Sequence, residues 1–442
     1  MRRRSSCGGF WGHWGMHSRL GDLAEINPSL PPSSVASPSA EVSFIPMGDV
    51  SESGRWYYRR TAKVGSLKSG FTPFAEGDIL FAKITPCMEN GKGTHAVGLV
   101  NGIGYGSTEF HVLRARNSAN PRYLFQLSCY RQLRLKAEAS MIGSAGQKRV
   151  PASFLAAHEV FAPPCAEQSA IARILDTLDT QIEKTQALIA KLEQVKEGLL
   201  HDLLTRGVDE NGELRPSAEE APELYKESAL GLIPRGWRLG PIERFLDRVI
   251  DYRGKTPAKT PIGIRLITAK NVRLGYVYDE PHEFISPSSF DAWMTRGIPQ
   301  RGDVLFTTEA PLGNVARIET DEQLAFAQRI IILQANEATD SKFLKFLMLG
   351  RPFRHRLFAM GSGSTVEGIQ QSTFRRLVIA VPECLHEQSE IAHRMASAES
   401  RVESEIVLLR KCQQAKAGLM DDLLTGRIRV TPLLDRETAE AA

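Results

Sequence analysis

The sequence lacks features that would place it in several common classes of protein. Its six cysteines are scattered and include no Cys-x-x-Cys pair, which argues against a disulfide framework and a zinc site and favours a reducing compartment. No run of about 18 apolar residues is present, so no segment is predicted to cross a membrane. The basic first 16 residues contain no apolar core and do not resemble a secretory signal. We therefore expect a cytoplasmic protein.

Residues 1–16 are rich in Gly and Trp and show no periodicity. We expect translation to begin at Met16, with residues 1–15 disordered or not made. A native basic arm is the alternative.

Catalytic motifs are also missing. A DNA methyltransferase should show Asn-Pro-Pro followed by an aromatic residue that stacks on a flipped base, but residues 27–30 read NPSL. The segment DYRGKTP at 251–257 suggests a phosphate loop, yet Val249 occupies the position where Walker A requires glycine. The ten histidines show no metal-ligand spacing. We predict a chain without catalytic residues, a metal site or a cofactor of its own; a hidden active site is the alternative.

Charge is distributed unevenly along the chain. Residues 17–163 and residues 235–383 each carry a surplus of five positive charges, whereas residues 164–234 carry a surplus of seven negative charges. Solvated surface alone could produce a surplus of five. The same surplus in both blocks is nevertheless what two phosphate-facing modules would show.

The strongest positive feature is a repeat at an offset of 220 residues. EQSAIARILDTLDTQIEKTQALIAKLEQVKEGLLHDLLT at 167–205 lies over EQSEIAHRMASAESRVESEIVLLRKCQQAKAGLMDDLLT at 387–425. Because the repeat is long and occurs only twice, it indicates a duplicated domain pair and not a solenoid. Neither copy contains proline, so each is predicted to form one long helix.

Apolar residues in each copy recur at alternating steps of four and three. This period of 3.5 residues is typical of a coiled coil, whereas a helix in a globular core usually shows a wider apolar stripe. The apolar seam residues are Ile171, Leu175, Leu178, Ile182, Ile189, Leu192, Leu199 and Leu203 in the first copy, and Ile391, Met395, Val402, Leu409, Leu419 and Leu423 in the second. We expect the helices to pack on each other, and to be antiparallel if a pseudo-twofold relates the copies. The alternative buries each helix in its own domain.

The predicted helices are long enough to act as a spacer. At 1.5 Å per residue, 39 helical residues span roughly 58 Å. One turn of B-DNA is about 34 Å, so the helices could separate two modules by more than one turn.

The remaining sequence forms two blocks of mixed character. Short apolar or alternating runs predict strands at 42–46, 79–82, 110–113, 304–307 and 330–333, and residues 120–139 and 340–360 look helical with Asn120 and Asp340 as N-caps. The expected fold is α/β: two mixed α/β domains joined by two long antiparallel coiled-coil helices, with a pseudo-twofold internal repeat. The expected segments are a disordered or mis-called start (1–16), a first domain (17–163), a first helix (164–206), a polar linker (207–234), a second domain (235–383), a second helix (384–428) and a tail (429–442).

Polar, cationic loops in both domains are candidates for DNA contact. Asn and Gln can pair with adenine, Arg and Lys with guanine, and Lys, Ser, Thr and backbone amides with phosphate. The first-domain candidates are Lys83, Thr85, Asn90, Lys92, Ser107, Thr108, Gln147, Lys148 and Arg149. The second-domain candidates are Tyr252, Arg253, Lys255, Thr256, Lys270, Asn271, Thr307, Glu309, Asn314, Gln328, Arg329, Gln370 and Gln371. Each of these residues, taken alone, could belong to a solvated loop. The prediction of DNA contact depends on their clustering in loops of two basic domains.

Together these motifs resemble the specificity subunit of type I restriction–modification enzymes. The resemblance covers about residues 17–428 and depends on the repeated helices, GLIPRGWRLG at 231–240, GDILFAKITPCMENGKG at 77–93, GYGSTEF at 104–110, DYRGKTPAKT at 251–260 and ITAKNV at 267–272. One departure is that the first block has HWGMHSRLGDL at 13–23 in place of the Ile-Pro-x-Gly-Trp lead-in.

The resemblance implies a function. Each domain would be a target-recognition domain that reads one half of a split, asymmetric site in double-stranded DNA. The helices would set the gap and dock two modification (methyltransferase) subunits, which bind S-adenosylmethionine, and ATP-dependent restriction subunits would join with ATP and Mg. A coiled-coil protein adaptor without a nucleic-acid role, and a methyltransferase with degenerate motifs, are the alternatives.

Overall fold

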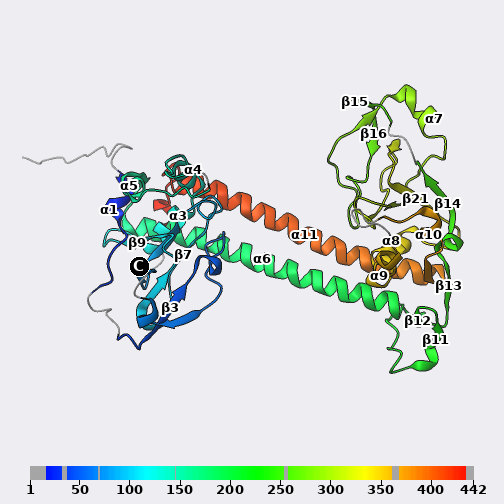
Figure 1. The fold of residues 1–442 in the computed structure, drawn as a ribbon, viewed down its shortest axis with the longest axis horizontal. Coiled ribbons are helices and arrows are strands. Elements are labelled where there is room, and N and C mark those ends of the chain that lie inside the picture. The colour runs from blue at the N-terminus through cyan, green and yellow to red at the C-terminus, as the bar shows by residue number, and fades with distance from the viewer. Residues whose placement is uncertain are drawn as a thin grey trace, which may run out of the picture. The chain divides into compact units, whose positions relative to one another are not determined.

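The computed structural model describes residues 16–31, 37–67, 70–144, 146–252, 257–360 and 368–434. The chain divides into two compact units: unit 1 comprises Met1–Gln186 and Leu408–Ala442, and unit 2 comprises Ala187–Val407. Each unit contains one α/β domain and a part of each long helix (Figure 1).

The strands of unit 1 form two four-stranded sheets and one pair. They are β1 (His17–Arg19), β2 (Ala24–Ile26), β3 (Glu41–Ile45), β4 (Arg60–Lys63), β5 (Thr72–Ala75), β6 (Ile79–Ala82), β7 (Gly93–His95), β8 (Ile103–Gly106), β9 (Phe110–Ala115) and β10 (Glu159–Phe161). The sheet orders are β2-β9-β6-β7 and β4-β3-β8-β5, and β3 pairs with β8 in parallel. Strand β1 pairs with β10, so the two ends of the first domain lie together.

The helices of unit 1 cover these sheets. They are α1 (Leu20–Leu23), α2 (Val64–Leu67), α3 (Pro121–Cys129), α4 (Arg131–Ala139), α5 (Ala152–Ala157) and the first part of α6 (Cys165–Thr205). The Asn120 side chain accepts hydrogen bonds from the amides of Arg122 and Tyr123, which confirms the predicted N-cap. The single helix expected here is instead two helices, because Tyr130 adopts an extended conformation between them.

Unit 2 repeats this arrangement. Its strands are β11 (Tyr225–Ser228), β12 (Gly231–Pro234), β13 (Trp237–Pro241), β14 (Leu246–Asp251), β15 (Lys259–Thr260), β16 (Ile264–Ile267), β17 (Phe284–Ile285), β18 (Val304–Thr307), β19 (Val315–Arg317), β20 (Leu324–Phe326), β21 (Ile330–Ala335) and β22 (Val378–Pro382). The four-stranded orders are β14-β21-β18-β19 and β15-β17-β16-β20, with β16 and β20 parallel. The first of these orders matches β2-β9-β6-β7, so the two domains share a fold despite their divergent sequences.

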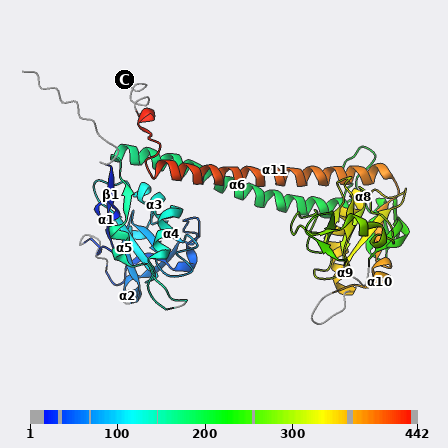
Figure 2. The ribbon, with the colours of Figure 1, turned by 90° about the horizontal axis from the view of Figure 1, so that it is seen from above.

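The helices of unit 2 are α7 (Phe290–Trp293), α8 (Ser341–Leu349), α9 (Arg351–Met360), α10 (Gln371–Arg375) and the first part of α11 (Leu385–Leu423). Asp340 caps α8 by accepting from the amides of Lys342 and Phe343, as predicted. Figure 2 shows α8 beside α11, where Lys345 forms an ion pair of 2.9 Å with Glu399.

The segment predicted as a polar linker contains ordered structure. Strands β11 and β12 form an antiparallel hairpin, and Val208 and Ile233 are buried in the core of unit 2. The segment predicted as a polar linker over 207–234 therefore also contributes a hairpin and two core residues to unit 2.

The predicted seam residues of α6 and α11 are all buried or half-buried, while most residues between them are exposed. In unit 1, Ile171 and Leu175 share a core with Leu423. In unit 2, Leu203 shares a core with Ile391. The two helices therefore meet in both units, and neither is buried in its own domain alone.

Among the helices that the structure describes, none combines the length and apolar character needed to span a membrane.

Candidate nucleic-acid interface

The three candidate loops of the first domain lie side by side in unit 1. The amide of Lys83 donates to the carbonyl of Glu109 at 2.9 Å, and the amide of Thr85 donates to the carbonyl of Lys148 at 3.1 Å. The amide of Val150 donates to the carbonyl of Lys83 at 2.9 Å. Three segments, of which the first and last are joined by Thr85 and Lys148 at a separation of 63 positions, thus form one loop cluster.

A salt bridge stabilises this first cluster. The Arg149 guanidinium donates to both carboxylate oxygens of Glu109, with Nη2 2.8 Å from Oε1. These hydrogen bonds hold the pKa of Glu109 below its usual value. Arg149 therefore has a role in shaping the loops, and a contact with DNA would compete with Glu109. Lys148, in contrast, is exposed.

Candidate loops of the second domain converge in the same way. The amide of Thr308 donates to the carbonyl of Arg329 at 3.0 Å, and the amide of Ile369 donates to the carbonyl of Thr308 at 3.0 Å. Arg329 and Glu309 form an ion pair of 2.8 Å. Arg329 also has a φ of 75°, a left-handed conformation that is strained for a non-glycine residue and is frequent at functional sites.

The segment that follows β16 joins the second cluster. The Asn314 side-chain amide donates to the carbonyl of Val272 at 2.8 Å. Lys270, two residues before Val272, is exposed. Within the part of the chain that the structure describes, the cluster of unit 2 therefore draws on four segments, one more than the cluster of unit 1.

Three candidates have buried side chains that hydrogen-bond to the protein's own backbone, and their contact with DNA stays a prediction. Asn271 is buried, and its side chain bonds to the amide of Thr268 and to two backbone carbonyls. Buried Thr307 donates its hydroxyl to the carbonyl of Pro311 at 2.6 Å. Buried Tyr252 donates its hydroxyl to the carbonyl of Gly297. Their polar side chains looked available in the sequence, but they satisfy the backbone of irregular loops.

The other candidates differ in accessibility. Exposed candidates are Asn90, Thr108, Gln147, Lys148, Lys270, Arg329 and Gln370. Half-buried candidates are Lys83, Thr85, Lys92, Ser107, Arg149, Glu309, Asn314, Gln328 and Gln371. Arg253, Lys255 and Thr256 lie outside the described residues.

The repeated Glu-Gln pair at the start of each long helix has a defined role. Glu167 accepts from Arg429 at 2.8 and 2.6 Å and from the amide of Val430 at 3.2 Å. In unit 2, Glu387 accepts from Arg215 at 2.5 and 2.9 Å. Each glutamate therefore holds the segment that follows the end of the other helix, and we call each arrangement a glutamate clamp.

The glutamine beside each clamp is used identically in both units. Gln168 accepts from the amide of Asn120 at 2.8 Å, and Gln388 accepts from the amide of Asp340 at 2.7 Å. The side-chain amide of each donates to two backbone carbonyls of its own unit. The repeat therefore preserves the anchorage of each domain to its own helix.

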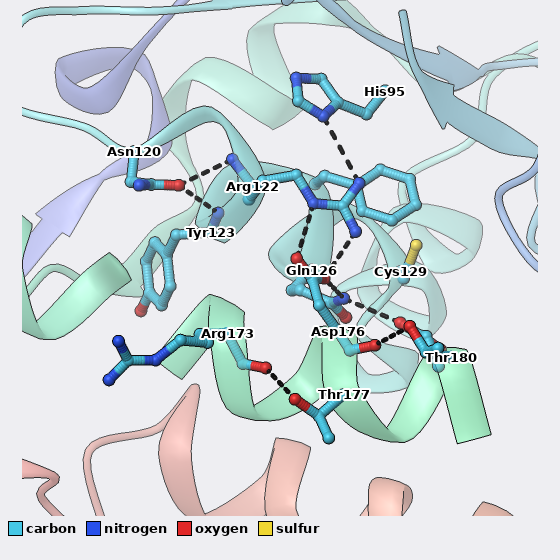
Figure 3. A network of polar contacts seen from close by, with 12 residues as sticks. His95, Asn120, Arg122, Tyr123, Gln126, Cys129, Arg173, Asp176, Thr177 and Thr180 are labelled. Atoms are coloured by element: carbon cyan, nitrogen blue, oxygen red, sulfur yellow. Dashed lines mark hydrogen bonds and ion pairs between the residues drawn. The ribbon is translucent and has the colours of Figure 1, made fainter. Parts of the chain in front are cut away.

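A polar network fixes the first domain against α6 in unit 1. Figure 3 shows Arg122 of α3 directed at Asp176 of α6, with Nε and Nη2 donating at 2.9 and 2.5 Å. Gln126 donates to Asp176 at 2.8 Å and to Asp179 at 2.9 Å. Lys416 of α11 donates to Asp179 at 2.5 Å. The carboxylates of Asp176 and Asp179 thus link the first domain to α6, and Asp179 also links α6 to α11.

Asp176→Ala is expected to loosen this attachment. The substitution leaves Arg122 without its bidentate partner and should lower the free energy of unfolding of unit 1 by about 1–2 kcal/mol, because the pair is partly exposed. A double-mutant cycle with Arg122→Ala, followed by denaturant unfolding, measures the coupling. If the losses in the free energy of unfolding from the two single substitutions simply add in the double variant, the Arg122–Asp176 pair contributes nothing to stability.

His95 gives unit 1 a pH dependence. Burial, and then the charge of Arg122, lower the pKa of His95 from 6.5 to about 4, although Asp176 and Glu76 oppose the shift. The unfolded chain therefore binds more protons than the folded chain between these values. Stability is fully present above pH 6.5 and is lost as the pH falls towards 4, by about 3 kcal/mol at most. Unfolding curves of His95→Gln should lack this part of the slope; an unchanged slope would exclude His95 as its source.

Comparison with known proteins finds similarity to type I restriction–modification specificity proteins. The type I restriction modification DNA specificity domain matches residues 14–194. The EcoEI specificity subunit of Escherichia coli is 40% identical over 178 residues, which are 40% of this chain and 28% of that protein. The EcoAI specificity subunit of Escherichia coli is 29% identical over 370 residues, covering 66% of this chain and 61% of that protein. The chain is thus similar to specificity subunits of type I restriction enzymes, and its first 194 residues include the match to the specificity domain.

Two solved structures from type I restriction–modification systems share the fold of this chain. A chain from a type I R-M system, solved to explain complex assembly and conformational transition, has a TM-score of 0.52 and 16% identity, with 93% of this chain and 98% of that chain covered. The type I S subunit from M. genitalium has a TM-score of 0.55 and 14% identity, with 92% and 95% covered. The chain spans less than two thirds of the length of the two Escherichia coli relatives.

Proposed function

We propose that this chain is the DNA-reading subunit of a type I restriction–modification complex. Each α/β domain, as a target-recognition domain, reads one half of a split, asymmetric site in double-stranded DNA. The observation that carries the proposal is the convergence of candidate loops in each unit, which joins distant segments into one polar cluster. The names of the relatives, all specificity subunits of type I restriction enzymes, agree with it. The comparisons give no support to the adaptor alternative.

In this proposal, α6 and α11 form an antiparallel coiled coil that sets the gap between the half-sites. The ion pair between Asp179 and Lys416 in unit 1 supports an antiparallel pairing, as do the clamps of Glu167 with Arg429 and of Glu387 with Arg215. In each case a residue early in one helix meets a residue late in, or after, the other. The two equivalent clamps support a pseudo-twofold relation between the repeats.

The proposed chain carries no catalysis of its own. Two modification subunits would supply S-adenosylmethionine-dependent methyl transfer, and restriction subunits would supply chemistry driven by ATP and Mg. The described residues include no group of His, Cys, Asp and Glu side chains able to hold a metal ion.

The docking surface for modification subunits would lie on the two long helices. Asp176, Asp179 and Glu183 of α6 already pair within unit 1, Glu183 with Arg55. These three acidic residues therefore attach the first domain to α6. We therefore place subunit docking on other faces of the helices.

The test is a map of methylated positions in the host genome with and without this gene. A split motif that disappears on deletion, and returns with the intact gene, is the expected result. A methylation pattern that is the same in both strains would contradict the proposal.

A further inference from the structure

Four of the nine tyrosines lie on two equivalent surface hairpins. We call them the tyrosine hairpins: residues 50–58, after β3 in unit 1, and residues 272–278, after β16 in unit 2. Tyr57 and Tyr58 are 58% and 61% exposed, and Tyr276 and Tyr278 are 57% and 44% exposed. An exposed cluster of large aromatic side chains indicates an interaction surface more often than an isolated apolar residue does.

The backbone shows that the two hairpins are equivalent. In unit 1, Val50 bridges to Trp56, and the amide of Tyr57 donates to the carbonyl of Asp49 at 3.1 Å. In unit 2, Val272 bridges to Val277, and the amide of Tyr278 donates to the carbonyl of Asn271 at 2.6 Å. Tyr57 and Tyr278 therefore occupy matching positions although the sequences around them differ.

Each hairpin lies beside the candidate loops of its own unit. The Lys92 ammonium donates to the carbonyl of Met47, just before the first hairpin, at 3.3 Å. The amide of Gly275 in the second hairpin donates to the carbonyl of Val315 at 2.7 Å, and Asn314 donates to Val272. In both units these hydrogen bonds therefore place the hairpin, or the segment that leads into it, beside the polar loops.

The chemistry of the hairpins suits nucleic acid. A tyrosine hydroxyl can bond to a phosphate oxygen, and its ring can pack against a sugar or a base. The first hairpin continues into Arg59, which lies over the Trp56 ring at 4.0 Å, whereas the next residue, Arg60, is already paired with Asp49. The second hairpin contains Arg273 beside Tyr278. Cations beside exposed phenols match a polyanion better than the surface of an acidic or neutral protein.

We propose that the two tyrosine hairpins are DNA-contacting elements, one at each half-site, and that Tyr57 and Tyr278 are equivalent contacts. This inference rests on the proposed function, because it assigns a further part of the same interface. The aromatic and basic run RWYYRR at 55–60 was the signal in the sequence that could have found the first hairpin; the second, interrupted by Gly275 and Val277, had no comparable run.

The test compares two variants of the full chain, Tyr57→Ala/Tyr58→Ala and Tyr276→Ala/Tyr278→Ala. Each is expected to lower the affinity for a duplex carrying the mapped site about tenfold. Hydroxyl-radical footprinting should show loss of protection in one half-site for the first variant and in the other half-site for the second. Leu135→Ala and Ile298→Ala, which remove exposed apolar side chains of the same units, are the matched controls and should bind as wild type.

The outcomes separate this inference from the proposed function. Wild-type affinity with both tyrosine variants would overturn the hairpin inference and leave the proposed function intact. Absence of any site-specific binding by the wild-type chain with its modification subunits would overturn both. Unchanged DNA affinity with weaker capture of the modification subunit would assign the hairpins to a protein interface and also overturn the inference.

Discussion

Replacing Glu387 with alanine is expected to lower the free energy of unfolding of unit 2 by about 3–5 kcal/mol. The carboxylate is buried and accepts hydrogen bonds from Arg215, from the Trp237 indole at 2.9 Å and from the amide of Val208 at 3.2 Å. Alanine removes the acceptor that these three donors share, and Arg215 keeps its hydrogen bond of 3.1 Å to the carbonyl of Arg206. Denaturant unfolding followed by tryptophan fluorescence measures the loss, since Trp237 lies within the clamp.

The matched control for this clamp variant is Glu390→Ala. Glu390 lies on the same helix and pairs with Arg394 at 2.7 Å in a partly exposed position, where a salt bridge contributes about 0–1 kcal/mol. Glu167→Ala should have the equivalent effect in unit 1. A loss of stability for Glu387→Ala no larger than that for Glu390→Ala would show that the clamp does not stabilise the fold.

Lengthening both long helices by one heptad is expected to change the DNA gap. Seven residues inserted between Gln186 and Ala187, and seven between Val407 and Leu408, add about 10 Å of helix. At 3.4 Å per base pair, the preferred gap should widen by about three base pairs, and affinity for the original site should fall at least about a hundredfold. Methylation mapping of a strain carrying the lengthened chain measures the new gap.

The matched control is a heptad inserted in only one helix. This change breaks the alignment of the two seams and should destabilise the pairing without defining a new gap. If the doubly lengthened chain methylates sites with the original gap, the helices do not act as the spacer.

The long helices were the most predictable part of the fold. Their period of 3.5 residues depends on local geometry alone, so the seam from Ile171 to Leu203 could be read directly from the sequence and is buried or half-buried throughout. The strands β6 and β18 were also predicted, because each is a short apolar run bounded by turn residues. The N-caps at Asn120 and Asp340 were predictable because capping depends on the residue type at the start of the helix, which is also a local property.

The candidate interface was only partly predictable, because exposure depends on contacts distant in sequence. Asn271 and Lys270 are neighbours with similar polar character, yet one is buried and the other exposed. The partners of Asn271 include the carbonyl of Pro281, ten residues away on an irregular loop. Likewise the pairing of Glu167 with Arg429 spans 262 residues, and no local pattern marks it.

The clamp at Glu167 bears on the order in which the chain becomes structured during synthesis. Unit 2 is built from one continuous stretch, Ala187–Val407, whereas unit 1 needs Met420, Leu423 and Arg429 from the last part of the chain. On the ribosome, the later-encoded domain can therefore close first. The earlier-encoded domain can build its sheets at once, but the part of α6 that packs with Met420 and Leu423 stays uncovered until the end of the chain has been synthesised.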